Sequence, residues 1–137
     1  YGIQFLTKKG YTPIQTPFFM KRHLMAATAQ LSDFDEQLYR LESAEQTEAK
    51  DDCFLIATAE QPVSSFYADE WLEKDQLPIR FAGWSSCFRK EAGAHGKDVW
   101  GIFRVHQFEK VEQFCLVDGE SSWEEHEKMR ETSEEFL

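Results

Sequence analysis

The sequence predicts an α+β domain in which an antiparallel sheet is flanked by helices. Residues 79–91 and 103–117 read as two strands that alternate between two faces, and a glycine-rich loop joins them. Segments of helical character stand at both ends of the chain. Hydrophobic residues make up 42% of the 137 residues and aromatic residues 15%, enough for the packed core of about one domain.

The N-terminal segment predicts the end of a helix followed by extended chain. Residues 2–9 have helical character, and Gly10 fits the left-handed position that commonly ends a helix. Pro13 and Pro17 then force an extended backbone, and proline in a strand belongs at a sheet edge or an interface.

Two helices are expected next. The first spans residues 19–31, with Leu24, Thr28 and Leu31 on one face. The second, in residues 32–42, is capped by Ser32 or Asp33. Its apolar stripe consists of Phe34, Leu38 and Leu41. The polar residues 43–52 that follow are expected to form a solvated loop.

The middle of the chain predicts a buried strand followed by a helix. Residues 53–60 form a short apolar run that delivers Thr58 and Glu60 at its end. Pro62 suits the first turn of a helix. The side chains expected to pack this helix are those of Phe66, Tyr67, Trp71 and Leu72.

The C-terminal residues 118–137 predict a helix that packs against the sheet. Ser121 and Ser122 each precede a glutamate by three residues, so either can begin a capping box. The acidic residues of this helix are expected to be solvated.

Composition narrows the class of protein. The net charge of −10 argues against nucleic-acid binding by bulk electrostatics, so any such contact must come from local groups or from parts outside these residues. The sequence contains no run of about 18 apolar residues, so no transmembrane helix is expected. The N-terminus resembles neither a secretory signal nor a transit peptide, and it suggests a segment of a longer protein.

Cysteine and histidine usage predicts no metal site built by the protein, zinc included. The three cysteines are far apart and lie in apolar or strand-like runs, as expected of reduced, buried thiols in a cytosolic protein. The four histidines do not stand at ligand spacing.

The two long strands carry charged side chains at positions where buried apolar residues would normally stand. Arg89 and Glu91 share a face of the first strand, and Arg104, Phe108 and Glu112 share a face of the second. If the strands pair through their loop, one sheet surface presents two guanidinium groups, two carboxylates and an aromatic ring.

Such a surface suits ATP together with an amino acid. Arginine binds phosphate or carboxylate in a bidentate manner, and an aromatic ring stacks on a purine. The alternative is that the charges form cross-strand ion pairs that only fix the register of the sheet. For a single residue the two readings are about equally good. For the whole set the second is weaker, because burying so many charges without a ligand is costly.

The loop at residues 92–101 is not a Walker phosphate loop, because it has no GK[ST] sequence and no helix follows it. Its length is typical of functional loops. His95 and Lys97 either reach a phosphate backbone or are simply solvated.

"CFRKEAG" at 87–93 and "RVHQFEKVEQF" at 104–114 resemble motif 2 of the class II aminoacyl-tRNA synthetases. Within that class, "TAEQP" at 58–62 is similar to the serine-loop signature of the seryl-tRNA synthetases, and residues 77–114 resemble their eukaryotic cytosolic form. "GYTPIQTPFFM" at 10–20 resembles motif 1, with Pro17 at the position of the motif's proline. The resemblance covers nearly the whole chain, residues 1–137, as part of one catalytic domain.

The resemblance implies a role for each matching position. Arg89 would bridge the ATP α-phosphate and the serine carboxylate, and Glu91 would meet the adenine amino group. Phe108 would stack on adenine, and Arg104 would lie near the terminal phosphates. The remaining residues implied at the ATP site are Lys90, Val105, His106 and Gln107. Those implied at the serine site are Thr58, Ala59, Glu60 and Glu112, together with Arg89.

The resemblance also implies a reaction and its partners. Serine and ATP, with Mg²⁺, would give seryl-adenylate, and serine would then pass to the 3′ end of its tRNA in a cytoplasmic homodimer joined through the motif 1 region. Motif 3 and the N-terminal tRNA-binding arm have no counterpart among these residues, so the isolated segment is expected to be inactive. Two alternatives stay open, namely a paralogue that binds ATP or serine without aminoacylation and a purely structural dimerisation module.

Overall fold

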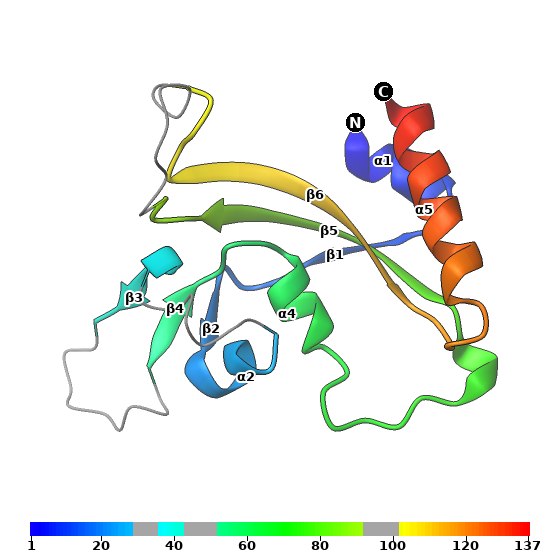
Figure 1. Ribbon diagram of the computed structural model, residues 1–137, viewed down its shortest axis with the longest axis horizontal. Helices are drawn as coiled ribbons and strands as arrows, with labels where there is room; N and C mark the ends of the chain where they lie inside the picture. The colour runs from blue at the N-terminus through cyan, green and yellow to red at the C-terminus, as the bar shows by residue number, and fades with distance from the viewer. Residues whose placement is uncertain (29–35, 43–51, 92–101) are drawn as a thin grey trace.

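A computed structural model describes residues 1–28, 36–42, 52–91 and 102–137, in which two three-stranded sheets lie side by side (Figure 1). The larger sheet has the strand order β1-β5-β6, and the smaller one has the order β2-β4-β3. Helices α1 and α5 lie on one side of the larger sheet, and the short helix α4 lies on the other (Figure 1). The α+β fold predicted from the sequence is confirmed.

Strands β5 (Ile79–Phe88) and β6 (Gln107–Leu116) form the antiparallel pair that the alternation predicted. Their register runs from Ile79 opposite Leu116 to Phe88 opposite Gln107. Both strands are shorter than predicted at the loop end. Glu91 has a φ of +53°, which no extended strand allows, and residues 102–106 form turns and bends rather than strand.

Helix α1 (Gly2–Lys8) ends as predicted. Gly10 has a φ of +89°, its N–H donates to the Thr7 carbonyl at 3.1 Å, and the N–H of Tyr11 donates to the Leu6 carbonyl at 3.0 Å. These two bonds satisfy carbonyls that a helix end would otherwise leave unpaired. The chain then enters β1 (Thr12–Gln15), a parallel edge strand beside β5, so Pro13 lies at a sheet edge as predicted.

The prediction of one helix over residues 19–31 is wrong at its start. Phe19–Lys21 form strand β2, which pairs with β4 (Cys53–Leu55), and only Arg22–Ala26 form helix α2. Tertiary pairing overrides the local pattern because it buries Met20 between two exposed neighbours. The predicted apolar face is also wrong, since Met25 is fully buried and Leu24 is exposed. Leu31 lies outside the described residues.

The second predicted helix is confirmed only in part among the described residues 36–42. Residues 36–37 are helical, but Arg40–Leu41 form strand β3, which pairs with β4. Leu38 is buried as predicted, whereas Leu41 is exposed. Within the predicted loop 43–52, Asp52 is buried and accepts a bond from Arg40 Nη2 at 2.8 Å. The remaining loop residues, together with Ser32, Asp33 and Phe34, lie outside the described part of the chain.

Helix α4 (Glu60–Ser64) is much shorter than predicted. The chain leaves it through turns and a 3₁₀ helix at Lys74–Gln76. The ring centroids of Phe66 and Tyr67 lie 5.9 and 6.2 Å from that of Phe81 on β5, so these two aromatics pack as predicted. The packing role predicted for Trp71 is wrong, because its side chain is 98% exposed.

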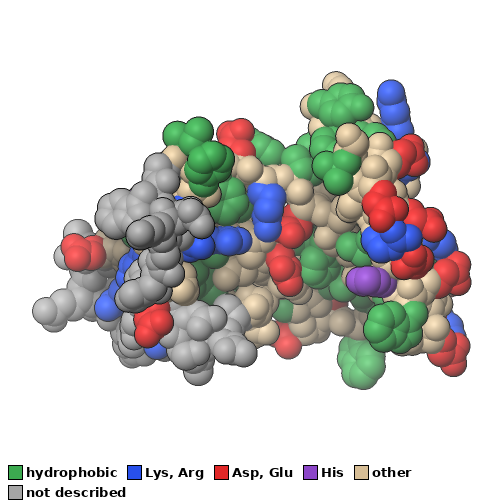
Figure 2. All heavy atoms as spheres, turned by 45° about the horizontal axis from the view of Figure 1, so that its top comes forward, with side chains coloured by type: hydrophobic (Ala, Val, Ile, Leu, Met, Phe, Trp, Pro, Cys, Tyr) green, Lys and Arg blue, Asp and Glu red, His purple; other side chains and the backbone are tan. Residues whose placement is uncertain are grey.

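Helix α5 (Ser122–Phe136) begins without the predicted capping box. The Asp118 carboxylate instead accepts bonds from the backbone N–H groups of Glu120 at 2.9 Å and Ser121 at 3.1 Å. These bonds hold the pKa of the Asp118 carboxyl below its ordinary value. Most of the acidic residues of the helix are exposed, and charged side chains gather at the end of the molecule that holds α5 (Figure 2).

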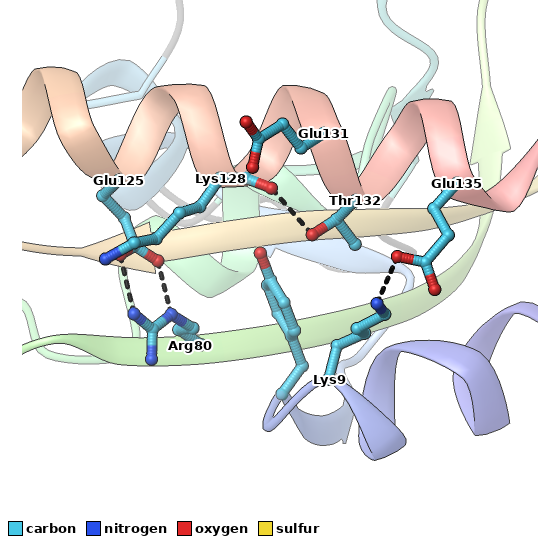
Figure 3. Close-up of a pocket in the computed structure, with 8 residues that line it drawn as sticks. Lys9, Arg80, Glu125, Lys128, Glu131, Thr132 and Glu135 are labelled. Carbon is cyan, nitrogen blue, oxygen red and sulfur yellow. Dashed lines mark hydrogen bonds and ion pairs between the residues drawn. The ribbon is translucent and has the colours of Figure 1, made fainter.

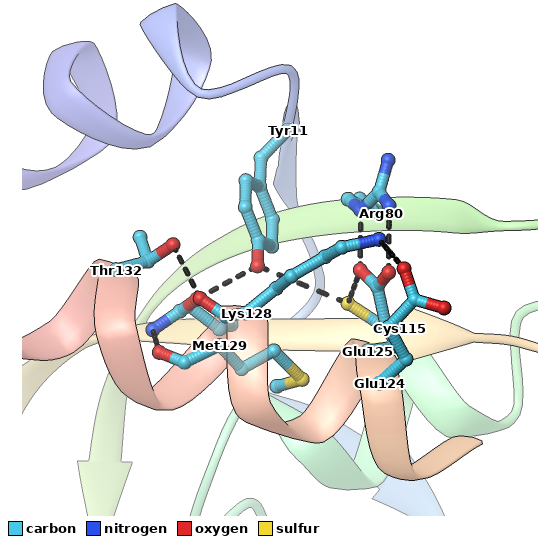
Figure 4. Close-up of polar contacts among 9 residues, drawn as sticks. Tyr11, Arg80, Cys115, Glu124, Glu125, Lys128, Met129 and Thr132 are labelled. Atoms are coloured by element: carbon cyan, nitrogen blue, oxygen red, sulfur yellow. Dashed lines mark hydrogen bonds and ion pairs between the residues drawn. The ribbon is translucent and has the colours of Figure 1, made fainter. Parts of the chain in front are cut away.

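Glu125 is the exception on α5, because it is only 3% exposed and faces the sheet. The Arg80 guanidinium on β5 donates to both of its carboxylate oxygens, to one of them at 2.6 Å (Figure 4). These bonds hold the pKa of the Glu125 carboxyl below its ordinary value. The expectation that all acids of the helix are solvated is therefore wrong at this position.

The Arg80–Glu125 pair lies in a polar layer between the sheet and α5. The Tyr11 hydroxyl donates to Gln113 Oε1 at 2.7 Å, and burial raises the pKa of this phenol well above its ordinary value. Burial also raises the pKa of the nearby Cys115 thiol to about 11, so it stays protonated at neutral pH. A cavity of about 340 Å³ lies beside this layer (Figure 3). Two of the residues that line it, Lys9 and Glu135, form an ion pair.

All three cysteines are free thiols, with Cys87 buried and Cys53 and Cys115 half-buried. In the part of the chain that the structure describes, no helix has the length and apolar character that crossing a membrane requires.

Gly83 allows α4 to lie close to the sheet. A Cβ atom at this position would stand 3.3 Å from the Cβ of Ala59 and 3.5 Å from Cγ2 of Val63. We expect Gly83→Val to lower the free energy of unfolding by about 2 kcal/mol, because overpacking a filled site forces neighbours to move. Urea denaturation measures this loss.

Gly119→Ala is the control for that measurement. A Cβ atom at residue 119 would meet nothing within 4 Å, and the backbone there does not adopt the left-handed conformation that favours glycine. An unfolding curve of Gly83→Val that overlays the parent curve would contradict close packing of α4.

Candidate functional site

The α4-facing side of β5 and β6 carries the predicted site. Opposite residues in an antiparallel pair point to the same face. Phe108, Lys110 and Glu112 of β6 stand opposite Cys87, Ser85 and Gly83 of β5 in that order. Gly83 lies against Ala59 and Val63, which identifies this face as the one that α4 covers. The small residues on β5 leave room above the sheet for the longer side chains of β6.

Arg89 lies at the end of β5 over the ring of Phe108. The guanidinium carbon is 5.1 Å from the ring centroid, within the range of a cation–π contact. Arg89 Nε donates to the Ala57 carbonyl at 3.3 Å, and its backbone N–H donates to the His106 carbonyl at 2.9 Å. None of the described residues offers this guanidinium a carboxylate. Arg89 is therefore fixed in direction with terminal N–H groups left for an anion.

Thr58, Lys110 and Glu112 form a second polar group a few residues along the same face. The Thr58 hydroxyl donates to Glu112 Oε2 at 2.5 Å, and Lys110 Nζ lies 2.6 Å from the same oxygen. Lys110 Nζ also donates to the Thr58 hydroxyl at 2.9 Å. The predicted proximity of Thr58 to Glu112 is thus present, and it joins the chain after β4 to strand β6 of the larger sheet.

Thr58 also sets the start of α4. Its hydroxyl accepts from the backbone N–H of Glu60 at 3.2 Å. Ala59 follows the hydroxyl directly and is fully buried, whereas Glu60 is exposed in the first turn of the helix. The short segment 58–60 therefore holds a hydroxyl that contacts Glu112, a buried residue and a solvated carboxylate.

Glu91 and Arg104 form an ion pair with each other at the loop end of the strands. The pair connects the residues on either side of segment 92–101. This is the cross-strand pairing that the structural alternative predicts, so these two residues have a role without any ligand. Glu91 holds a φ of +53°, an uncommon backbone conformation that often occurs at functional sites.

His106 lies between the strand pair and the segment before β3. Its Nδ1 is 3.1 Å from the Arg89 carbonyl and 3.0 Å from the Tyr39 hydroxyl. The backbone N–H of Lys90 donates to the Gln37 carbonyl at 2.9 Å. Segment 36–42 thus holds the backbone of Arg89 and Lys90 from one side.

Three predicted residues lie differently from the rest. Gln107 stands opposite Phe88, so its side chain points to the other face of β6 from Phe108. Val105 is an exposed residue just before β6. Arg104 lies in the preceding bend rather than on the sheet face. His95 and Lys97 lie outside the described residues.

Sequence reasoning missed three participants. Ala57 offers only a carbonyl, and Tyr39 comes from a segment predicted as helix, so neither carried a chemical signal. Lys110 did carry one, because it stands on the same strand face as Phe108 and Glu112. No cluster of three or more His, Cys, Asp or Glu side chains suited to a metal ion occurs among residues 1–28, 36–42, 52–91 and 102–137.

A family model for the tRNA synthetase class II core domain (G, H, P, S and T) matches residues 39–137. The chain belongs to this class II synthetase family. Cytoplasmic serine–tRNA ligase of Saccharomyces cerevisiae is 57% identical over 138 residues, which are 99% of this chain and 29% of the relative. Serine–tRNA ligase of Helianthus annuus is 56% identical over 138 residues, which are 99% of this chain and 30% of that relative. The chain therefore spans less than a third of these relatives.

Solved structures agree with this assignment. The cytoplasmic serine–tRNA ligase of Naegleria fowleri in complex with AMP superposes with a TM-score of 0.90 at 51% identity, over 99% of this chain and 31% of that one. The seryl-tRNA synthetase of Pyrococcus horikoshii complexed with ATP gives 0.84 at 43% identity, over 98% of this chain and 29% of that one. The present fold is thus that of part of a class II catalytic core.

Proposed function

We propose that the protein containing this chain is a serine–tRNA ligase, and that residues 1–137 are part of its one catalytic domain. The protein would activate L-serine with ATP to seryl-adenylate and transfer serine to the 3′ end of its tRNA. Relatives of this name at 49–57% identity support the proposal, as do the similar structures of synthetases in complex with ATP and AMP.

The observation that carries the proposal is the position of Arg89. Its guanidinium is fixed by Phe108 and the Ala57 carbonyl, it has no carboxylate partner among the described residues, and it lies on the same face as Glu112. A preorganised guanidinium stabilises the negative charge that develops at phosphorus when a carboxylate attacks. In this role Arg89 would bind the α-phosphate and the serine carboxylate together.

Phe108 and the neighbouring residues would hold the nucleotide. The Phe108 ring is half-buried, which leaves part of it open for stacking on adenine. Glu91 would accept from the adenine amino group and Arg104 would approach the terminal phosphates. Both roles require the ion pair between Glu91 and Arg104 to open or shift when ATP binds. Lys90, Val105, His106 and Gln107 would complete this part of the site.

Thr58, Ala59, Glu60 and Glu112 would bind serine together with Arg89. Carboxylate and hydroxyl oxygens accept bonds from the ammonium and hydroxyl groups of an amino acid. A site that bonds the serine hydroxyl rejects analogues that lack it, because its own polar groups would then stay unpaired.

Magnesium would enter with ATP. Mg²⁺ bound with ATP is typically held by one or two carboxylates together with the phosphates, and no cluster of three or more acidic, His or Cys side chains occurs among the described residues. The further partners of the proposal are the serine tRNA and a second copy of the protein, joined through the motif 1 region near residues 10–20. Several relatives are named cytoplasmic, and we propose the same location for this protein.

The test is ATP–pyrophosphate exchange by the full-length protein, assayed with each of the amino acids in turn. We expect exchange with serine alone at physiological concentration and transfer of serine to tRNA. ATP binding without exchange would support the non-aminoacylating paralogue instead. Residues 1–137 alone are expected to give no exchange, and robust exchange by them would contradict a site shared with the rest of the domain.

A further inference from the structure

Lys110 has a position in the site that the functional proposal does not yet explain. Its Nζ lies 2.6 Å from Glu112 Oε2 and donates to the Thr58 hydroxyl at 2.9 Å, while that hydroxyl donates to the same Oε2 at 2.5 Å. The three polar groups form a closed triangle. Residues 110 and 112 belong to one strand and Thr58 to the chain after β4, so the triangle also joins two separate elements.

The two carboxylate oxygens of Glu112 are not equivalent in this arrangement. Oε2 accepts a hydrogen bond from the Thr58 hydroxyl and forms an ion pair with the Lys110 ammonium. Oε1 accepts no hydrogen bond from any residue in the described part of the chain. The last torsion of a glutamate side chain is broad, so an unsupported carboxylate would sample many orientations. A hydrogen bond and an ion pair that converge on a single oxygen restrict the carboxylate to one orientation.

We infer that Lys110 is a positioning residue for the amino-acid substrate. By holding Glu112 through Oε2 and fixing Thr58, it presents Oε1 to the ammonium or hydroxyl group of the substrate. This inference rests on the proposed function, because it takes serine as the ligand of Glu112. Lys110 touches neither ATP nor the reacting atoms in this scheme, and it acts only through Glu112 and Thr58.

Lys110 also balances the charge of the half-buried carboxylate before any substrate is present. Its own side chain is 31% exposed and that of Glu112 is 21% exposed. Burying an unpaired charge is costly, so a free Glu112 would turn toward solvent or bind a stray cation. With the lysine in place, the carboxylate is already desolvated and oriented when serine arrives, and less binding energy is lost to ordering it.

The same contacts also admit a simpler role. Residues two apart on one strand face can pair only to support the sheet. In that role Lys110 would affect unfolding but not discriminate between the two substrates. The two roles therefore differ in the ratio of the KM values for serine and ATP, which a loss of stability alone does not change.

The experiment measures ATP–pyrophosphate exchange by the full-length protein as its parent form and as Lys110→Met, Lys110→Arg and Lys74→Met. Lys74 is the matched control, a lysine on the surface with a side chain 76% exposed. For Lys110→Met we expect the KM for serine to rise about tenfold, the loss of roughly one charged hydrogen bond, with the KM for ATP within twofold of the parent. Lys110→Arg, which keeps the charge but moves the donors, should show a smaller but still selective rise in the serine KM, and Lys74→Met should match the parent.

An unchanged serine KM in Lys110→Met would overturn the inference, and so would equal increases in both KM values. Failure of the underlying function looks different, because the parent itself would then show no exchange with serine, and both proposals would fall. If Lys110→Met does not fold, Lys110→Arg decides the matter. It preserves the charge but shifts the donors, so a selective rise in the serine KM supports positioning, and parent values for both substrates at full stability reject it.

Discussion

Replacing Arg89 with alanine in the full-length protein is expected to reduce serine-dependent ATP–pyrophosphate exchange by about a thousandfold. The guanidinium is held by the Phe108 ring and the Ala57 carbonyl, and in the proposed function it would stabilise the charge at phosphorus. Its loss removes an interaction that strengthens in the transition state, so kcat should fall more than the KM for serine rises. Steady-state exchange kinetics measure both.

Arg130→Ala is the control for this experiment. Arg130 is an exposed arginine of α5 that pairs only with Glu127 and Glu134 of its own helix among the described residues. Its variant should keep full exchange. The unfolding curve of Arg89→Ala should stay close to that of the parent. A variant that loses stability but retains exchange would instead support the alternative in which these residues serve only the structure of a dimerisation module.

The second large effect concerns the attachment of α5 to the sheet. Arg80→Met removes both guanidinium donors from Glu125, whose side chain is 4% exposed, and leaves only the weak Cys115 thiol donor (Figure 4). Leaving a buried carboxylate without its partner typically costs 3–5 kcal/mol, so we expect the free energy of unfolding to fall by about 3 kcal/mol. Urea denaturation of the intact protein measures this loss, and a decrease below about 0.5 kcal/mol would contradict a buried pair.

The pH dependence of this variant has a definite sign. In the parent protein Arg80 lowers the pKa of Glu125, so the pair contributes its full stability above the ordinary glutamate pKa of about 4.3. That contribution is lost as the pH falls through the lowered value. In Arg80→Met, burial without a partner raises the pKa of Glu125 instead, and acidification relieves the cost. The stability gap between parent and variant should therefore narrow as the pH falls from 7 toward 4.

The double variant Arg80→Met, Glu125→Gln separates lost attraction from buried charge. If most of the cost comes from the unpaired carboxylate, neutralising it should recover well over half of the lost stability at pH 7. Glu127→Gln is the matched control, because Glu127 pairs with Arg130 on the exposed side of the same helix, where ion pairs contribute little. A double variant as unstable as Arg80→Met would mean that lost packing dominates.

The long strands and the terminal helices could be predicted from the sequence, whereas strands β2 and β3 of the small sheet could not. Alternation over β5 and β6 is a strong local signal, and Gly10 marks the end of α1 by its backbone alone. Strands β2 and β3 have two or three residues each, too short for a period to emerge. Their conformation comes from pairing with β4, which no local pattern contains. Helix α4 stops early because the following residues turn to place Phe66 and Tyr67 on Phe81.

The same distinction applies to the site. Arg89, Phe108 and Glu112 could be placed on one face from strand alternation, and their type indicated the chemistry. The ion pair between Glu91 and Arg104 was predictable only as an alternative, because alternation cannot say which charges find each other in the absence of a ligand. Tyr39 reaches His106 across 67 positions of sequence, and such a contact follows from the tertiary fold alone.

On the α4-facing side of the larger sheet, long polar and aromatic side chains lie on one strand and small residues lie on its neighbour. Apart from Arg89 at the end of β5, the long side chains on this face come from β6, as Phe108, Lys110 and Glu112, while the opposite positions on β5 hold Cys87, Ser85 and Gly83, of which Ser85 and Cys87 have no exposed surface. In the proposed site, the chemistry of the bound groups would be determined mainly by β6, and the depth of the floor beneath them by β5. Substitutions on β5, at residues that would form no hydrogen bond with the ligand, could therefore change which ligand sizes fit. They would leave the chemical groups of β6 unchanged.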